Sequence, residues 1–164
     1  MTRIEVAGRA DAAVVGRLLA QFNAEFDTPS PTAEQFAARF ARLLAREDVL
    51  VLLAEESSSG GESVCGATGF AFITLRPTPY YDGPLAQLEE LYVVPSLRDR
   101  GIGTQLLHTA LEAMRGRGAG EMHINVDEVD TDTRRFYERH GFTNLETSGA
   151  TGTDYRMLCY LREL

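Results

Sequence analysis

Residues 98–103, with the sequence Arg-Asp-Arg-Gly-Ile-Gly, constrain the fold more than any other part of the chain. Residues 87–94 before them read as a strand that ends at Pro95. After them, apolar residues recur at helical spacing over 101–117, and glycines end that helix. A further strand is expected at 122–126. A right-handed crossover should therefore make these two strands parallel neighbours in one sheet.

The remaining segments predict further elements of both kinds. Thr32 and Gln35 have the spacing of a capping box and should open a helix. We expect other helices at 11–26 and 133–140, and other strands at 3–6, 49–54, 64–75, 142–145 and 155–161. The resulting order, β-α-α-β-β-β-α-β-α-β-β, predicts an α/β fold with a mixed, mostly antiparallel central sheet flanked by helices. We expect a single domain over 1–164.

Charge and composition exclude several classes of protein. The net charge of −8 argues against nucleic-acid binding, which needs a basic face. No apolar run approaches the length needed to cross a bilayer, and the first residues lack the apolar core of a signal peptide, so a cytoplasmic location without a membrane partner is expected. The two cysteines, Cys65 and Cys159, have no metal-site spacing and are expected to be buried strand residues, with no bound metal.

The turn after Pro95 has the chemistry of a phosphate site. The first turn of a helix offers free N–H groups and a positive dipole end, and glycines let the backbone approach a diphosphate closely. A glycine-rich helix cap would account for the glycines but not for the arginines. The Walker pattern is absent and the dinucleotide-binding pattern is incomplete. The predicted pyrophosphate-binding turn comprises Arg98, Asp99, Arg100, Gly101, Ile102, Gly103 and Thr104.

Two longer segments carry a resemblance to a known family. The segment LEELYVVPSLRDRGIGTQLL is similar to the acetyl-CoA-binding segment of the GNAT superfamily of N-acetyltransferases, and TDTRRFYERHGF resembles the second segment of that family. The chain departs from the family pattern at Asp130, where asparagine is usual, and at Thr133, where alanine is usual. Asp130 can still cap a helix, but an ionised carboxylate cannot donate a hydrogen bond to CoA.

The resemblance implies a GNAT-like acyl-CoA N-acyltransferase fold and acetyl-CoA as cosubstrate. It implies direct transfer of the acetyl group, in a ternary complex, to a primary amine on a small cationic metabolite or antibiotic. It also implies that the backbone of Tyr92, Val93 and Val94 pairs with the pantetheine arm, and that Tyr137 protonates the departing thiolate. We place Asn125 and Phe136 with the cofactor-binding residues. For Asn125, a side chain satisfied within its strand is the alternative.

The expected reaction needs a base, because an alkylamine is mostly protonated near neutral pH. Glu89 and Glu90 precede the predicted turn and are the candidates. Strand alternation puts Glu90 on the face of Tyr92 and Glu89 on the face of Leu91, so only one of them should face the cleft unless a bulge intervenes. The choice between the two glutamates stays open at this stage.

The acceptor is less clearly specified. Tyr80, Tyr81 and Asp82 precede the glutamate strand and could hold a cationic amine by stacking and charge, or could form a plain hairpin turn. An idle acyl-CoA-binding sensor or interaction module, and a protein N-terminal acetyltransferase, are the alternative functions. Because related proteins often form dimers, a homodimer through the last strands near Cys159 is the assembly to test.

Overall fold

The computed structural model describes residues 2–26, 29–56, 66–160 and 162. By internal packing the chain divides into two units, Met1–Ile124 and Asn125–Leu164, and each is described here by itself. The single domain expected over the whole chain stays a prediction. Among the helices of the described ranges, none has the length and apolar character needed to cross a membrane.

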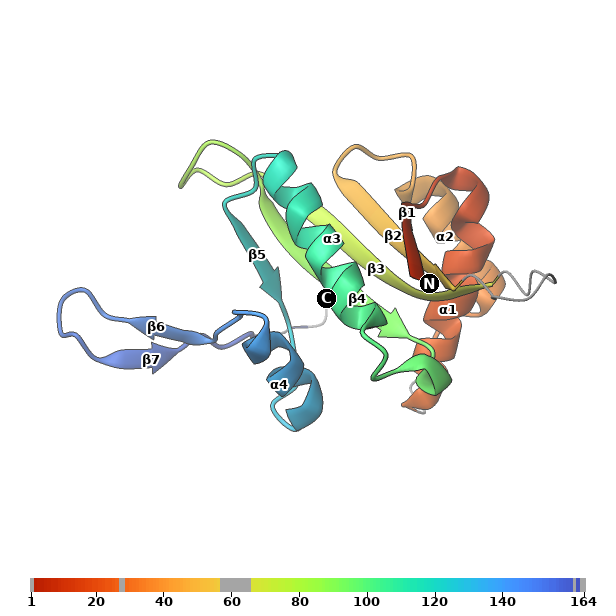
Figure 1. Cartoon of the computed structure of the whole chain (residues 1–164). Coiled ribbons are helices and arrows are strands. Elements are labelled where there is room, and N and C mark those ends of the chain that lie inside the picture. Colours follow the sequence, from red (N-terminus) through yellow and green to blue (C-terminus); the bar gives the residue numbers. More distant parts are fainter. Residues whose placement is uncertain (1, 27–28, 57–65, 161, 163–164) are drawn as a thin grey trace. The chain divides into compact units, whose positions relative to one another are not determined.

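The first unit is built on a five-stranded sheet with the spatial order β1-β2-β3-β4-β5 (Figure 1). All neighbouring strands are antiparallel except β4 and β5, which are parallel, as the crossover argument predicted. The mixed, mostly antiparallel sheet is therefore confirmed. The strands are β1 (Thr2–Val6), β2 (Val49–Glu56), β3 (Ala67–Arg76), β4 (Leu85–Val93) and β5 (Glu121–Ile124).

Helices cover both faces of this sheet, with α1 and α2 on one face and α3 on the other (Figure 1). Every residue of β2 from 49 to 54 is buried, because both of its faces are covered. Val49, Val51 and Leu53 belong to the core under α1 and α2, whereas Leu50 and Leu52 point the opposite way. The helices are α1 (Ala12–Glu25), α2 (Ala33–Leu43) and α3 (Ile102–Gly116).

Local signals account for how α1 and α2 begin and meet. The Thr32 hydroxyl accepts a hydrogen bond from the Gln35 N–H, and the Gln35 side chain accepts one from the Thr32 N–H, so the predicted capping box is confirmed. A Cβ at Gly16 on α1 would lie 2.6 Å from the backbone nitrogen of Ala37 on α2. Glycine is therefore required for the close approach of the two helices.

The second unit contains one helix and one hairpin. The helix α4 (Thr131–Arg139) begins two residues before the predicted start, and the Asp130 carboxylate accepts from the Thr133 N–H at 3.1 Å, which confirms the cap. The strands β6 (Leu145–Thr147) and β7 (Asp154–Arg156) form a two-stranded antiparallel sheet of their own. The strand predicted at 142–145 was placed three residues too early. Of the strand predicted at 155–161, residues 155–156 belong to β7, residues 157–160 do not, and residue 161 lies outside the described residues. The ladder between β6 and β7 has three residue pairs, which limits the length of both strands.

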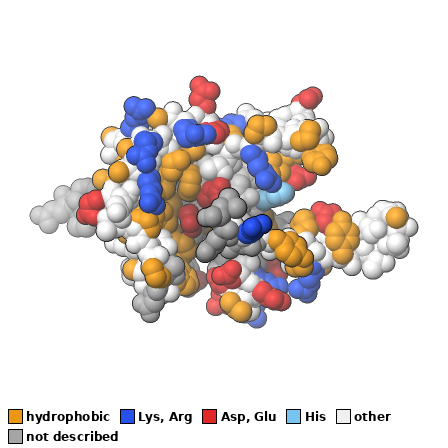
Figure 2. Space-filling view, turned by 180° about the vertical axis from the view of Figure 1, so that it is seen from behind, with side chains coloured by type: hydrophobic (Ala, Val, Ile, Leu, Met, Phe, Trp, Pro, Cys, Tyr) orange, Lys and Arg blue, Asp and Glu red, His pale blue; other side chains and the backbone are white. Residues whose placement is uncertain are grey.

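Two smaller expectations also concern strands. Cys159 is exposed and lies after β7, so its prediction as a buried strand residue was wrong. Val64 and Cys65, expected at the start of the third strand, lie outside the described residues. Figure 2 shows both basic and acidic side chains on the surface. The expected absence of nucleic-acid binding stays a prediction.

Candidate active site

The predicted phosphate turn connects β4 to α3 in the first unit. A short 3-10 turn over Pro95–Leu97 follows the strand, Asp99 and Gly101 then adopt φ angles of 60° and 81°, and α3 begins at Ile102. A Cβ at Gly101 would have no heavy atom within 4 Å, so this position faces open space. The first α-helical hydrogen bond runs from Gln105 N to Gly101 O, and the preceding N–H groups of α3 have no acceptor within the helix. The turn can thus receive an anion at the helix end.

The side chain of Arg98 folds back toward the strand that precedes it. Its Nε donates to the carbonyl of Val93 at 3.0 Å, and a terminal nitrogen lies 2.7 Å from Oε2 of Glu25 at the end of α1. Its guanidinium carbon lies 5.7 Å from the centre of the Tyr92 ring. Arg98 and Arg100 are both exposed. Direct pyrophosphate contacts by either arginine stay predictions.

The outer edge of β4 offers backbone groups for an extended ligand. Val94 N donates to Thr68 O of the β3 chain segment at 2.8 Å, and Val94 O accepts from Leu97 N. Because hydrogen-bonded and free pairs alternate in an antiparallel ladder, Tyr92 also directs its backbone groups to β3, while Leu91 and Val93 direct theirs to the other edge. There β5 pairs only with the stretch Leu85 to Leu88. Leu91 and Val93 therefore direct backbone groups to the part of this edge beyond the β5 pairing, and the predicted pairing of Tyr92, Val93 and Val94 with pantetheine stays a prediction.

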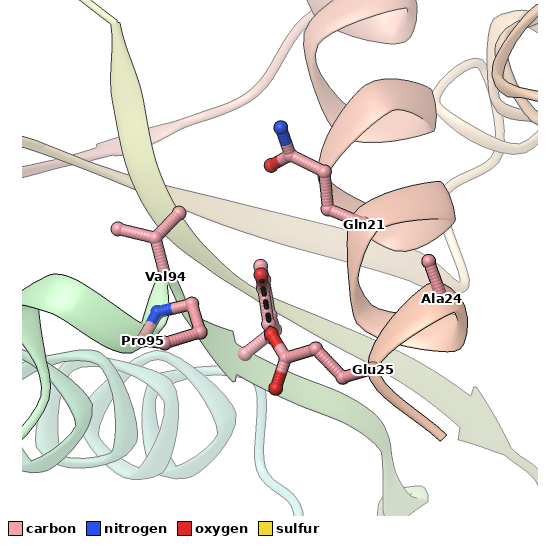
Figure 3. A pocket seen from close by; sticks show the side chains of 6 residues that line it. Gln21, Ala24, Glu25, Val94 and Pro95 are labelled. Atoms are coloured by element: carbon pink, nitrogen blue, oxygen red, sulfur yellow. Dashed lines mark hydrogen bonds between the residues drawn. The ribbon is translucent and has the colours of Figure 1, made fainter. Parts of the chain in front are cut away.

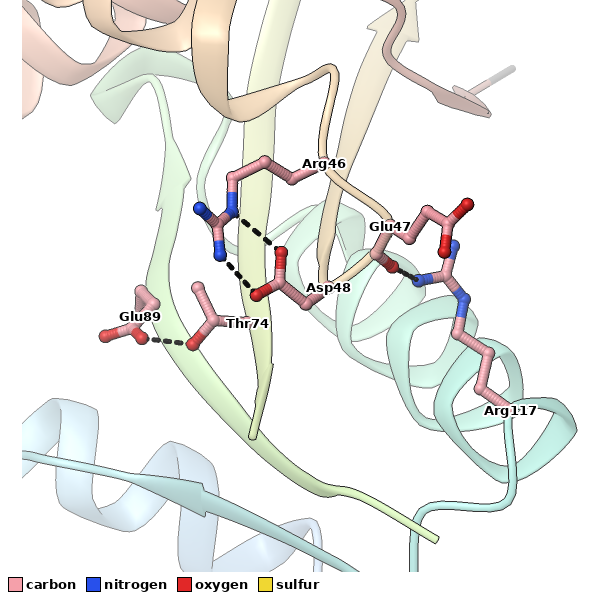
Figure 4. Close-up of polar contacts among 6 residues, drawn as sticks. All are labelled: Arg46, Glu47, Asp48, Thr74, Glu89 and Arg117. Atoms are coloured by element: carbon pink, nitrogen blue, oxygen red, sulfur yellow. Dashed lines mark hydrogen bonds and ion pairs between the residues drawn. The ribbon is translucent and has the colours of Figure 1, made fainter. Parts of the chain in front are cut away.

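A bulge in β4 settles how the two glutamates are oriented. Phe72 on β3 is the register partner of Glu90, but the next residue, Ile73, is the partner of Leu88, which leaves Glu89 as the extra residue. Phe72 and Thr74 share the face covered by α1 and α2, and the Thr74 hydroxyl donates to Oε1 of Glu89 (Figure 4). Both carboxylates therefore lie on one face, which simple alternation did not allow.

The environment of Glu90 suits a base. Burial is the larger cause and the neighbouring Glu89 carboxylate the smaller one, and together they raise the pKa of the Glu90 carboxyl from 4.5 to about 7. Glu89 itself is exposed. A carboxyl group with a pKa of about 7 is partly ionised near neutral pH and can accept a proton during a reaction. The pair thus combines one half-buried carboxyl that can accept a proton with one exposed anion.

An ion pair lies in the turn that leads into β2, next to the end of β3. Arg46 contacts Asp48 through two hydrogen bonds of 2.8 and 2.6 Å, just before β2 begins (Figure 4). The Arg46 guanidinium holds the pKa of the Asp48 carboxyl below its usual value. Both side chains of this ion pair are exposed and belong to one turn.

The predicted amine-binding loop lies at the other end of β4. Tyr80, Tyr81 and Asp82 precede Leu85, whereas the phosphate turn follows Val93, about 25 Å away along an extended strand. Tyr80 is 90% exposed. The Tyr81 ring lies against Gly120 before β5, where a Cβ would approach it to 2.9 Å. The structure does not bring this loop together with the phosphate turn, and its role in binding an amine stays a prediction.

The remaining predicted residues belong to the second unit. Tyr137 on α4 is 5% exposed, and its ring contacts those of Phe136 and Phe142 at centroid distances of 5.1 and 5.4 Å. Asn125 is exposed and follows β5, which ends at Ile124, so the strand predicted through 126 was too long. The roles proposed for Tyr137, Phe136 and Asn125 stay predictions.

Sequence reasoning missed Glu25, Thr74 and Leu91. Glu25 is 73 residues away from Arg98 in the chain, and Thr74 is 15 residues from Glu89. No local pattern indicates such partners. Leu91 could have been found only with the register of the neighbouring strand, because ladder pairing decides which residues direct their N–H groups to an open edge.

Comparison with known proteins identifies the class to which this fold and site belong. A model of the Acetyltransferase (GNAT) family matches residues 16–142. The chain belongs to this family, and it is an N-acetyltransferase with a GNAT fold, as the sequence resemblance implied. Glucosamine 6-phosphate N-acetyltransferase 1 of Oryza sativa subsp. japonica is 34% identical over 118 residues, which cover 70% of this chain and 67% of the relative.

Two further relatives support this assignment. Aminoglycoside N(6')-acetyltransferase type 1 of Klebsiella aerogenes is 34% identical over 118 residues, which cover 71% of this chain and 70% of the relative. A crystal structure of a protein from Arthrobacter sp. FB24, assigned as an acetyltransferase, is 46% identical with a TM-score of 0.82. That alignment covers 99% of this chain and 96% of the Arthrobacter chain.

Proposed function

We propose that this enzyme transfers the acetyl group of acetyl-CoA directly to a primary amine of a small, multiply cationic molecule. The observation that carries the proposal is the bulge in β4, which puts Glu89 and Glu90 on one face of a strand that leads into the phosphate turn. The carboxylates of Glu89 and Glu90, which can accept a proton, thus lie on β4, and the N–H groups proposed to bind an anion lie in the turn that follows this strand.

The donor is proposed from the turn and from the relatives. The free N–H groups at the start of α3 and the open space at Gly101 suit the pyrophosphate of CoA. The N–H groups of Leu91 and Val93 suit a pantetheine arm laid along the β4 edge. A structural neighbour with 20% identity, an aminoglycoside N-acetyltransferase, was crystallised in complex with CoA.

The chemistry follows from the two acid–base groups. The amine nitrogen attacks the thioester carbonyl carbon, the C–N bond forms, and the C–S bond breaks with its electron pair on sulfur. Glu90 accepts the proton lost by nitrogen, directly or through water. An edge N–H of β4 stabilises the charge on the carbonyl oxygen. Tyr137, assigned by its match to the family segment, gives a proton to the thiolate. No metal is required in this scheme.

The acceptor class follows from charge. Glu89 is an exposed carboxylate beside the proposed base, and the chain carries a net charge of −8. These groups attract a cation and repel a phosphate. Among the relatives, the acceptor named for one is an aminoglycoside and for another a phosphorylated amino sugar. The carboxylates of Glu89 and Glu90 favour a cationic acceptor such as a polyamine or an aminoglycoside over a phosphorylated amino sugar.

An amine panel tests this proposal by measuring thiol release from acetyl-CoA. We expect turnover with spermidine and with aminoglycosides, and at least tenfold lower kcat/KM with glucosamine 6-phosphate and with peptide amino termini. Tight CoA binding without turnover on any amine would instead indicate the idle acyl-CoA sensor. Preference for peptide amino termini would indicate a protein N-terminal acetyltransferase. The homodimer and the cytoplasmic location stay predictions.

A further inference from the structure

Glu25, the last residue of α1, connects that helix to the phosphate turn. Its Oε1 accepts a hydrogen bond from the Tyr92 hydroxyl at 2.8 Å, and its Oε2 accepts one from Arg98 at 2.7 Å (Figure 3 shows the contact to the tyrosine). Arg98 also donates to the Val93 carbonyl and lies over the Tyr92 ring. The three side chains therefore form a closed set of contacts between the end of α1, the end of β4 and the start of the turn.

This arrangement differs from an ordinary surface ion pair. Both carboxylate oxygens of Glu25 are used, and its side chain is only 24% exposed, compared with 44% for Arg98. Tyr92 is 3% exposed and packs against Phe22 of α1 with 5.4 Å between ring centroids. Burial, followed by the bond to Glu25, raises the pKa of Tyr92 to about 12, so the phenol stays a donor across the physiological range. The carboxylate of Glu25 is therefore held by a charge-assisted hydrogen bond from Arg98 and by a hydrogen bond from a buried, packed tyrosine.

Arg98 occupies the position from which the turn departs. Its backbone leaves the 3-10 turn in an extended conformation, and the left-handed residues Asp99 and Gly101 follow. The guanidinium of Arg98 is held by the Val93 carbonyl and by Glu25. These two contacts restrict the conformations that the backbone at Arg98 can adopt. The N–H groups that would meet a pyrophosphate begin at Ile102, four residues later, so a fixed Arg98 reduces the ordering cost of binding.

We propose that Glu25 is a positioning residue for acyl-CoA, which acts through Arg98 to hold the phosphate turn in its binding conformation. The inference rests on the proposed function, because it takes acyl-CoA as the ligand of the turn. Glu25 also lines an open hollow of about 410 Å³ with Gln21 and Pro95 (Figure 3). Its two carboxylate bonds, however, are directed to Tyr92 and Arg98. We therefore attribute the positioning role of Glu25 to its bonds with Tyr92 and Arg98, and not to the hollow.

A double-mutant cycle on the intact chain tests this role. The dissociation constant for CoA is measured by calorimetry for the wild type, Glu25→Ala, Arg98→Ala and the double variant. We expect Glu25→Ala to weaken CoA binding about tenfold. In the Arg98→Ala background, the same change should have less than a twofold effect, because the residue through which Glu25 acts is absent. Losses that multiply, or CoA binding that is unchanged or tighter in Glu25→Ala, would overturn the inference.

Two further variants keep the test specific. Glu25→Gln keeps an acceptor for Tyr92 and should give an intermediate loss, which also serves if the alanine variant does not fold. Gln21→Ala, one turn earlier on α1 and lining the same hollow, should leave CoA binding within twofold of the wild type. With the best amine, Glu25→Gln should raise KM for acetyl-CoA with kcat within twofold. A wild type that does not bind CoA refutes the proposed function itself, whereas normal binding with independent losses refutes only the role of Glu25.

Discussion

Thr74 on β3 donates its hydroxyl hydrogen to the carboxylate of Glu89 on β4. Thr74 lies on the face covered by α1 and α2, which is also the face of Phe72, the register partner of Glu90. The bond therefore holds Glu89 beside Glu90, where strict alternation would have put it on the opposite face. Two carboxylates with different exposure result from one extra residue in the strand.

The first prediction concerns the charge of Glu89. Because its carboxylate contributes to the raised pKa of Glu90, Glu89→Gln should lower that pKa and move the acidic limb of the kcat/KM profile to lower pH. Burial is the larger cause and remains, so the limb should move by less than the full difference between 7 and 4.5. A pH series with the best amine measures the shift. Glu112→Gln on α3, which removes one exposed carboxylate elsewhere, should not move the limb.

The second prediction links Glu90 to stability. Between pH 4.5 and about 7 the folded protein keeps a proton that the unfolded chain has released, so this group lowers stability as pH rises through that window. Glu90→Gln should raise the free energy of unfolding at pH 8 by about 1–2 kcal/mol after allowance for solvent screening. At pH 4 the change should be small. Urea denaturation at both pH values measures it, and an equal effect at the two would contradict a raised pKa.

The third prediction concerns the backbone of the turn. Gly101 has a φ of 81°, so Gly101→Ala should cost about 1–2 kcal/mol of stability and weaken CoA binding, because the new Cβ faces the open space at the turn. Thermal unfolding and calorimetry measure the two effects. Gly116→Ala is the matched control at the other end of α3. Its Cβ meets no atom within 4 Å and its φ is not positive, so it should stabilise the helix and leave CoA binding unchanged.

The fourth prediction addresses Tyr137. If this phenol protonates the departing thiolate, Tyr137→Phe should lower kcat about 100-fold, with KM for acetyl-CoA within twofold of the wild type. Steady-state kinetics at saturating amine provides the measurement. Tyr155→Phe, on the exposed hairpin strand β7, is the control and should behave like the wild type. An unchanged kcat in Tyr137→Phe would remove the acid role from this residue.

Local signals in the sequence determined much of the fold. The capping box at Thr32, the cap at Asp130 and the glycine at 101 specify where three helices begin, because each depends on residues within one turn of the chain. The crossover rule then gave the parallel pair of β4 and β5. Segment resemblance added the family, which the comparison confirms, and the prediction that the turn binds the cofactor. The last hairpin was misplaced, because its strands are short and exposed and carry no pattern of burial.

Tertiary structure decided the details on which the site depends. The bulge that brings Glu89 to the face of Glu90 arises from the register of β3 against β4, and neither strand encodes it alone. The partner of Arg98 is a carboxylate on α1, brought there by the packing of that helix on the sheet. The pKa of Glu90 likewise depends on burial under distant segments. Sequence by itself therefore determined the elements, their order and the family, whereas packing between segments far apart in the chain decided which faces, edges and charges come together.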